Sequence, residues 1–156
     1  MNPGDQIPSL SFNATNDLHA NLDNYRGKWL ILYFYPKDAT PGCTTEGQDF
    51  RDNYQSFTAL NAVIFGISRD SLKSHENFKE KQQFPFELIS DADEALCQLF
   101  DVIKMKSMYG KQVRGIERST FIIDPEGKLA HEWRKVSVKE HVADVLATLK
   151  SLQSKP

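Results

Sequence analysis

Cys43 has the surroundings of a reactive thiol. It follows an all-apolar run at residues 29–35 and lies within the polar segment 36–46, where a helix is expected to begin. The first N–H groups of a helix lack intrahelical partners and direct partial positive charge at whatever lies beside them. Because this charge favours the thiolate, which is the nucleophilic form of cysteine, we predict that Cys43 is a catalytic nucleophile.

The alternative is that Cys43 is a small buried hydrophobe, which is the commoner role of a free cysteine. Its neighbours Gly42 and Thr44 are small or polar, which is not typical of a core position. Pro36 and Pro41 fix φ in the segment that leads to the thiol, and a cysteine that only packs does not require such a segment. These neighbours favour the chemical interpretation.

The strands and helices that would position Cys43 are predicted from apolar patterns. Residues 29–35 and 62–68 are apolar throughout most of their length, which is typical of strands covered on both faces of a sheet. Helices are predicted from near Cys43 and from near Ser71. The other predicted elements are a hairpin of residues 7–12 and 17–20 around a turn at 13–16, a strand over 86–89, a helix over 91–100, a strand over 119–123, a turn at 124–127, a strand over 129–133 and a last helix over 138–152.

The order of these elements predicts the fold class. Strand–helix–strand–helix units followed by a hairpin and a helix indicate an α/β fold, with a central mixed sheet flanked by helices and an N-terminal β-hairpin. That order is typical of a thioredoxin-like fold. With 156 residues the chain is long enough to bury one core, and we expect residues 1–156 to form a single domain.

Composition argues against several classes of protein. The net charge is −2 and the lysines and arginines are dispersed, so we expect no nucleic-acid partner. No apolar run is long enough to span a bilayer, and the first residues lack the features of a signal peptide, so we expect no membrane association. Two cysteines do not make a disulfide framework, which favours a reducing, cytoplasmic location.

No metal or cofactor site is predicted. The four histidines lack the short spacings of zinc ligands, and the chain contains no Cys-x-x-Cys pair. Glycine-rich phosphate loops are also absent from the sequence. We therefore interpret the histidines as surface or structural residues and expect neither a metal nor a cofactor.

The segment around Cys43 resembles the active-site motif of the peroxiredoxins, a family of thiol peroxidases. The motif is Pro36-x-x-x-Thr40-x-x-Cys43, and the flanking residues are similar to those of the bacterioferritin-comigratory-protein, or Q-type, branch. The resemblance extends nearly from end to end of the chain, through residues 33–37, 40–44, 88–91, 109–111 and 115–121.

The resemblance implies a role for each matching residue. Cys43 would be the peroxidatic cysteine, whose thiolate attacks the terminal oxygen of hydrogen peroxide or an alkyl hydroperoxide and becomes a sulfenic acid. The leaving oxygen becomes negatively charged, so hydrogen-bond donors aimed at the peroxide would stabilise the displacement. The implied supporting groups are the Thr40 hydroxyl, the Arg118 cation, the amides of Gly42 and Cys43, Pro36 as a shield against water, and Glu46 as an ion-pair partner of Arg118.

Taken singly, three of these residues also have ordinary structural interpretations. Arg118 precedes a buried strand and is open to interpretation as a salt-bridge residue. Thr40 occupies a place where threonine commonly caps a helix, and Pro36 would serve to end a strand. The match of all three with Cys43 favours the catalytic interpretation.

The chain departs from two-cysteine relatives at both usual positions of a resolving cysteine. Five residues after Cys43 stands Gln48, and the equivalent position in the following helix is Lys79. Cys97 remains, but it lies among apolar residues of an expected helix, and buried thiols in apolar surroundings are mostly inert. We therefore expect a one-cysteine enzyme that acts as a monomer and is regenerated by thioredoxin, glutaredoxin or glutathione.

Two alternatives to that mechanism stay open from the sequence. In the first, Cys97 resolves the oxidised Cys43 as a two-cysteine enzyme. In the second, oxidation of Cys43 switches a redox sensor or binding protein, which would react once rather than turn over. A disulfide oxidoreductase of the thioredoxin type is disfavoured, because it would need a second cysteine at position 46, which is Glu46.

Overall fold

The computed structural model describes residues 1–154 and contains two sheets. None of the helices in this part of the chain combines the length and the apolar character that crossing a membrane requires. In chain order the elements are β1 (Ser11–Ala14), β2 (Leu18–Asn21), η1 (Leu22–Tyr25), β3 (Trp29–Phe34), α1 (Pro41–Asp52), α2 (Tyr54–Ala59), β4 (Ala62–Ser68), α3 (Leu72–Gln82), β5 (Glu87–Ser90), α4 (Ala95–Leu99), β6 (Ile103–Met108), β7 (Lys111–Ile116), β8 (Ser119–Ile123), β9 (Leu129–Trp133) and α5 (His141–Gln153).

The main sheet is mixed and has the order β2-β1-β5-β4-β3-β8-β9. Strands β3, β4 and β5 are parallel neighbours, whereas β8 pairs antiparallel with β3 and with β9. At the far edge β1 pairs antiparallel with β2 and β5, so the expected N-terminal hairpin is part of the sheet. This arrangement confirms the predicted central mixed sheet.

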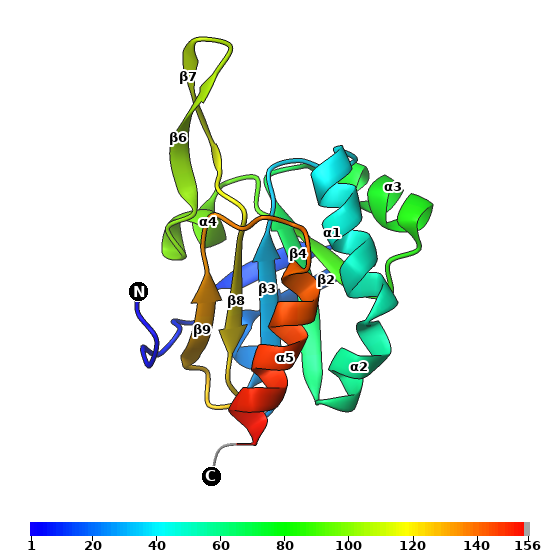
Figure 1. The fold of residues 1–156 in the computed structure, drawn as a ribbon, viewed down its shortest axis with the longest axis vertical. Helices are drawn as coiled ribbons and strands as arrows, with labels where there is room; N and C mark the ends of the chain where they lie inside the picture. The colour runs from blue at the N-terminus through cyan, green and yellow to red at the C-terminus, as the bar shows by residue number, and fades with distance from the viewer. Residues whose placement is uncertain (155–156) are drawn as a thin grey trace.

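The central strand β3 supplies side chains to both cores of the molecule. Alternate residues of a strand point to opposite faces, which explains why this segment is apolar throughout. Helices α1, α2, α3 and α5 cover one face, and α4 and η1 cover the other. Figure 1 shows α5 lying across its face of the sheet. The first face receives Ile31, Tyr33 and Tyr35, and the second receives Leu30, Leu32 and Phe34.

Several predicted elements have other bounds in the structure. The strand predicted over 86–89 is Glu87–Ser90, and the last helix, predicted over 138–152, is His141–Gln153. The hairpin strands lie at Ser11–Ala14 and Leu18–Asn21, because the chain reverses through Asn16 and Asp17, which both have positive φ. The first helix is divided where the Asn53 side chain donates to the Asp49 carbonyl. The helix expected over 91–100 is only Ala95–Leu99, since Asp91 accepts hydrogen bonds from two amides of α4 and residues 91–94 form its approach.

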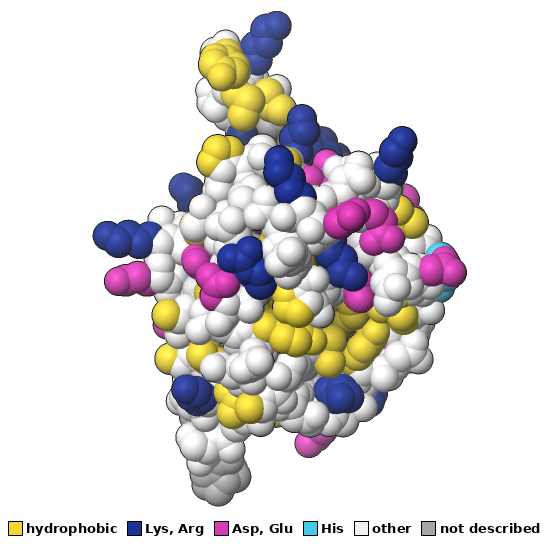
Figure 2. All heavy atoms as spheres, turned by 90° about the vertical axis from the view of Figure 1, so that its right-hand side faces the viewer, with side chains coloured by type: hydrophobic (Ala, Val, Ile, Leu, Met, Phe, Trp, Pro, Cys, Tyr) yellow, Lys and Arg dark blue, Asp and Glu magenta, His cyan; other side chains and the backbone are white. Residues whose placement is uncertain are grey.

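The sequence patterns did not predict β6 and β7, which form a two-stranded ribbon outside the main sheet. Tyr109 and Gly110, at its tip, both have positive φ, as a two-residue hairpin turn of type I′ requires. Most of its side chains face solvent, so it lacks the apolar alternation of a half-buried strand. Exposed hydrophobic side chains gather on it instead, as Figure 2 shows at the projecting end of the molecule: Met105, Met108, Tyr109 and Val113.

Candidate active site

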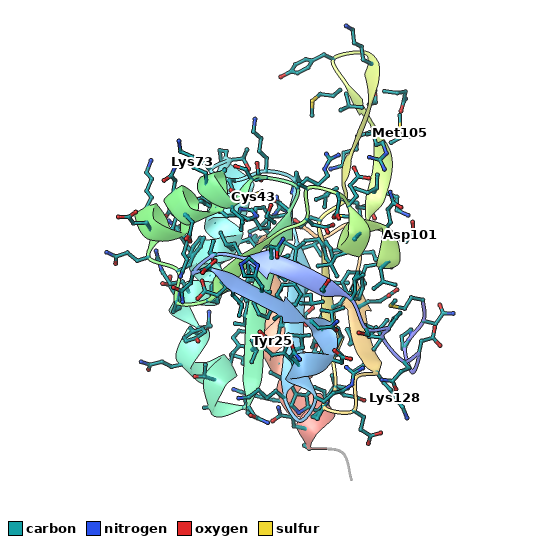
Figure 3. All side chains as sticks on the ribbon, turned by 180° about the vertical axis from the view of Figure 1, so that it is seen from behind. Tyr25, Cys43, Lys73, Asp101, Met105 and Lys128 are labelled. Atoms are coloured by element: carbon teal, nitrogen blue, oxygen red, sulfur yellow. The ribbon has the colours of Figure 1, made fainter. Side chains whose placement is uncertain are left out.

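The site forms where β3 ends and α1 begins. Ser119 of β8 pairs with Phe34, the last residue of β3, in an antiparallel register. Arg118 therefore lies beside the chain that leaves β3, although it is 75 residues from Cys43 in the sequence. Figure 3 places Cys43 at the end of the molecule from which the ribbon carrying Met105 projects.

The thiol of Cys43 lies in the first turn of α1 and is 2% exposed. Nη2 of Arg118 lies 3.4 Å from its Sγ. The Arg118 cation and the N-terminal end of α1 therefore both direct positive charge toward the sulfur. Tyr33, Tyr35 and Phe50 pack in the same cluster and hold the thiol on the inner side of the helix.

A buried carboxylate holds the Arg118 side chain in place. Nη1 of Arg118 donates to Oε1 of Glu46 over 2.6 Å, and Glu46 is fully buried. Glu46 follows Cys43 by three residues, so both side chains lie on the same face of α1. Burial raises the pKa of the Glu46 carboxyl to about 7, and the neighbouring Arg118 charge limits that rise. Within the described chain, Oε2 of Glu46 has no hydrogen-bond partner.

Gly42 allows the guanidinium to approach the helix closely. A Cβ at this position would lie 3.2 Å from Nη2 of Arg118, the nitrogen that also contacts the thiol. Such a contact is tighter than most side chains tolerate, so any larger residue would move the guanidinium or the helix. The absence of a side chain at position 42 therefore contributes to the geometry around Cys43.

Thr40 is the N-cap residue of α1, but its hydroxyl does not cap the helix. Oγ1 donates instead to the Lys37 carbonyl over 2.8 Å, which commits its proton and leaves the oxygen's lone pairs as acceptors. The simple capping interpretation of this threonine is therefore wrong. Pro36 is half-buried and follows Tyr35, whose amide makes a last ladder bond to the Ile67 carbonyl.

Comparison with known proteins identifies the family. The model of the AhpC/TSA family matches residues 3–132, which is more than half of the chain. The chain belongs to the AhpC/TSA family. Over 152 residues this AhpC/TSA protein is 52% identical to peroxiredoxin Bcp of Bacillus subtilis, with 97% of each chain covered. Over 150 residues it is 54% identical to peroxiredoxin Bcp of Xanthomonas campestris, with 94% of each chain covered.

Solved structures of similar proteins agree with this assignment. The bacterioferritin comigratory protein of Xanthomonas campestris has a TM-score of 0.88 and 55% identity, covering 92% of this chain and 91% of its own. A cysteine variant of Xylella fastidiosa PrxQ has a TM-score of 0.94 and 45% identity, covering 99% of this chain and 98% of its own. The protein is therefore a peroxiredoxin, a thiol peroxidase with the thioredoxin-like fold predicted from its sequence.

The second thiol of this peroxiredoxin is on the other side of the sheet. Cys97 belongs to the core cluster that contains Leu32 and Phe34, whereas Cys43 belongs to the cluster that contains Tyr33. Both cysteines are free, and Cys97 is fully buried. Burial, together with the neighbouring Asp91 carboxylate, holds the pKa of the Cys97 thiol well above its usual range. Its thiolate is therefore disfavoured.

The two positions at which related enzymes would carry a resolving cysteine have structural partners here. Nε2 of Gln48 donates to Oε1 of Gln82 over 2.9 Å, which links α1 to α3. Nζ of Lys79 lies 2.7 Å from Oε1 of Glu87, which links α3 to β5. At both positions the side chain therefore links two elements of the fold.

Sequence patterns did not predict a buried polar network beside the thiol. Asp38, Asp70 and His75 bring three possible ligand atoms within 4.8 Å of one another, as metal ligands would be. Hydrogen bonds already engage both carboxylate oxygens of Asp38 and both ring nitrogens of His75, so we assign the group to structure rather than to metal binding. The sequence did contain a signal for this network. Asp38 follows β3 and Asp70 follows β4, and parallel neighbouring strands end at the same edge of a sheet.

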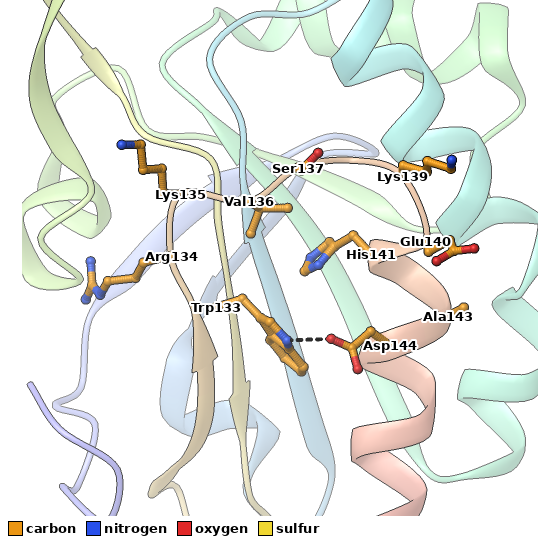
Figure 4. A pocket seen from close by; sticks show the side chains of 10 residues that line it. All are labelled: Trp133, Arg134, Lys135, Val136, Ser137, Lys139, Glu140, His141, Ala143 and Asp144. Carbon is orange, nitrogen blue, oxygen red and sulfur yellow. Dashed lines mark hydrogen bonds between the residues drawn. The ribbon is translucent and has the colours of Figure 1, made fainter.

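A pocket of ≈ 760 Å³ lies where the chain leads from β9 into α5, between Trp133 and the first turn of α5 (Figure 4). The amide of Val136, a lining residue, donates to the Arg118 carbonyl, so one wall of the pocket is bonded to the segment that carries Arg118. His141 bonds to Thr120 over 2.8 Å, and burial lowers the pKa of His141 to about 4. All residues that line the pocket lie between Trp133 and Asp144 in the sequence, so the Cys43 thiol is not part of it.

Proposed function

We propose that Cys43 is the peroxidatic residue of this peroxiredoxin. The thiolate sulfur attacks the terminal oxygen of a peroxide, an S–O bond forms and the O–O bond breaks. Sulfur is oxidised to a sulfenic acid, while the other oxygen leaves as water or an alcohol after taking up a proton. The observation that carries this proposal is the 3.4 Å approach of the Arg118 guanidinium to Sγ, with that guanidinium held by buried Glu46.

The neighbouring groups suit the charge that develops during the displacement. Arg118 would stabilise both the thiolate and the oxygen that leaves with negative charge, and the amides of Gly42 and Cys43 would add donors from the helix end. Thr40 would accept a hydrogen bond from the peroxide hydroxyl, because its own proton is donated to Lys37. The half-buried Pro36 ring would limit access of water to the sulfur.

We propose hydrogen peroxide and alkyl hydroperoxides as substrates. The Xanthomonas campestris relative, which is 55% identical to this chain, is described by its alkyl peroxide reduction activity. The thiol of this chain is packed among aromatic rings, which offer apolar contacts to an alkyl group. Both observations support organic hydroperoxides beside hydrogen peroxide.

We propose that the enzyme uses one cysteine for catalysis. Gln48 and Lys79 occupy the positions expected for a resolving thiol, and Cys97 lies beneath the opposite face of the sheet. An external thiol would therefore attack the sulfenic acid, releasing water and forming a mixed disulfide. A second thiol would then release Cys43 and leave as a disulfide, and thioredoxin, glutaredoxin and glutathione are the candidates.

One experiment tests both the peroxidase role and the cysteine count. Reduced protein is treated with one equivalent of hydrogen peroxide in the presence of dimedone, and intact and peptide masses are recorded. A dimedone adduct on Cys43, with Cys97 still open to alkylation, is the expected result. A loss of two hydrogens with neither thiol alkylatable would make Cys97 the resolving residue. An unchanged mass would contradict the peroxidatic role of Cys43.

A further inference from the structure

Asp38 is the centre of a buried hydrogen-bond network in the segment between β3 and α1. Its Oδ1 accepts from the Tyr35 hydroxyl over 2.6 Å, and its Oδ2 accepts from the Ser74 hydroxyl over 2.8 Å. Nδ1 of His75 lies 2.7 Å from the same Oδ2. Burial raises the pKa of Tyr35 well above its usual range, so its phenol remains a donor. Asp38 therefore receives donors on both oxygens.

Both ring nitrogens of His75 face acceptors. Nε2 lies 2.9 Å from the Ile89 carbonyl, which only accepts hydrogen bonds. Nδ1 faces Asp38, which is already occupied as an acceptor by two hydroxyls. Since His75 is fully buried, water does not substitute for these partners. Nε2 therefore carries a proton, and Nδ1 shares a hydrogen bond with Oδ2 of Asp38.

The segment held by Asp38 has a backbone that needs support. Ala39 has φ 64, a conformation that an L-residue with a Cβ adopts unfavourably. The Asp38 amide donates to Oδ2 of Asp70 over 2.9 Å, and Asp70 is held in turn by the Ser68 hydroxyl. Asp38 is thus fixed through both its side chain and its amide, on the residue next to the strained one.

We propose that His75 is a positioning residue for the peroxide site, a role that rests on the proposed function of Cys43. The His75 ring holds Asp38, and Asp38 holds the segment that carries Pro36 and Thr40. Pro36 limits the space in front of the thiol, and the Thr40 hydroxyl oxygen accepts the hydrogen bond of the peroxide. His75 touches neither sulfur nor substrate and acts only through this segment.

The test compares two reactions of Cys43 in a His75→Gln variant. Peroxide reduction needs Thr40 and Pro36 in place, whereas alkylation by iodoacetamide needs only a reactive thiolate. We expect the rate constant with hydrogen peroxide to fall by about tenfold or more, because small misplacements at a reacting centre are costly. The alkylation rate should change much less. Equal changes in both rates, or no change in the peroxide rate, would overturn the proposal.

Phe78→Leu is the matched control. Phe78 is buried in the same helix and packs beside Tyr35 and Phe84, but it has no polar contact with Asp38. The Phe78→Leu variant should have a lower unfolding midpoint, while its rates of peroxide reduction and of alkylation change by the same factor. If Phe78→Leu separated them as His75→Gln does, general loosening of α3 would explain the effect and the positioning role would be wrong.

A measurement on the unmutated protein tests the hydrogen bonds of His75 without reference to catalysis. We expect nitrogen NMR to show a proton on Nε2 of His75, as its contact with the Ile89 carbonyl requires. An unprotonated Nε2 would overturn the assigned contacts of the ring and the proposal built on them. Failure of wild-type Cys43 to react with peroxide would contradict the proposed function instead, and the NMR result would still decide the state of His75.

Discussion

Oε1 of Glu46 lies 2.6 Å from Nη1 of Arg118, in a pair whose carboxylate is fully buried. The other terminal nitrogen of the same guanidinium faces the sulfur of Cys43. A planar fork that engages the Glu46 carboxyl group with one nitrogen and the Cys43 sulfur with the other has a fixed orientation. The acidic residue in the helix therefore determines where the positive charge stands relative to the thiol.

Arg118→Lys should lower the rate constant for peroxide reduction by about 10²-fold, the usual size of the loss when a fixed charge-stabilising donor is removed. A lysine ammonium is a point charge on a flexible chain and does not engage Glu46 and the sulfur as a fork. Stopped-flow measurement of Cys43 oxidation provides the rate. Full activity in the lysine variant would show that charge alone, without the fork, is sufficient.

Glu46→Gln should change how stability depends on pH. The ordinary pKa of glutamate is 4.5, and in the folded chain the pKa of Glu46 is about 7. Between these values the folded state binds more protons than the unfolded state, so the contribution of Glu46 to stability is complete below pH 4.5. This contribution is lost as the pH rises through 7, and the free energy of unfolding then falls by about 3 kcal/mol in total.

Urea unfolding at a series of pH values measures this contribution. Glutamine does not ionise, so the decline between pH 5 and pH 8 should be weaker in Glu46→Gln than in the wild type. Glu126→Gln is the control, since its carboxylate is largely exposed. Parallel pH profiles for wild type and Glu46→Gln would show that Glu46 ionises at its ordinary pKa.

Gly42→Ala should slow peroxide reduction by about tenfold if Arg118 acts as proposed, because the added methyl group would displace its guanidinium from the sulfur. The added Cβ would lie 3.2 Å from Nη2 of Arg118. Gly115→Ala provides the comparison, since a Cβ there would meet Arg69 at 3.9 Å, an ordinary contact. Equal rates in the two alanine variants would mean that Arg118 adjusts at no cost.

Ala39→Gly should raise the free energy of unfolding by up to about 1 kcal/mol, because it removes the penalty of a side chain at positive φ. The φ of Ala39 is 64. Ala147→Gly, on the exposed side of the middle of α5, should instead destabilise the protein by about 1 kcal/mol, the usual cost of glycine in a helix interior. Chemical denaturation measures the free energy of unfolding of both variants. A lower stability of Ala39→Gly than of the wild type would contradict strain at the positive φ of Ala39.

Patterns that depend on local burial were predictable from the sequence. The second buried strand has the predicted bounds, Ala62–Ser68, because its apolar side chains alternate between the two cores. Ser71 accepts from the Ser74 amide as the N-cap of α3, so the predicted start of that helix is confirmed. Cys43 lies in the first turn of α1, where the sequence placed a helix start.

Contacts between distant segments were not predictable in the same way. The position of Arg118 depends on the antiparallel register of β8 against β3, and only the family resemblance pointed to it. The network of Asp38 and His75 joins three segments, and neither residue belongs to an apolar pattern. The ribbon was missed because its strands bury little, so no alternation marks them.

Two of the three methionines lie on the ribbon, where their side chains are exposed to solvent. Met105 and Met108 are 61% and 51% exposed, and the third methionine, Met1, is 36% exposed. Peroxides convert a thioether to a sulfoxide, whose polar oxygen disrupts a core when the side chain is buried. In this enzyme the added oxygen would face water at all three positions. Chemical damage to its methionines by its own substrates would therefore leave both sides of the sheet packed.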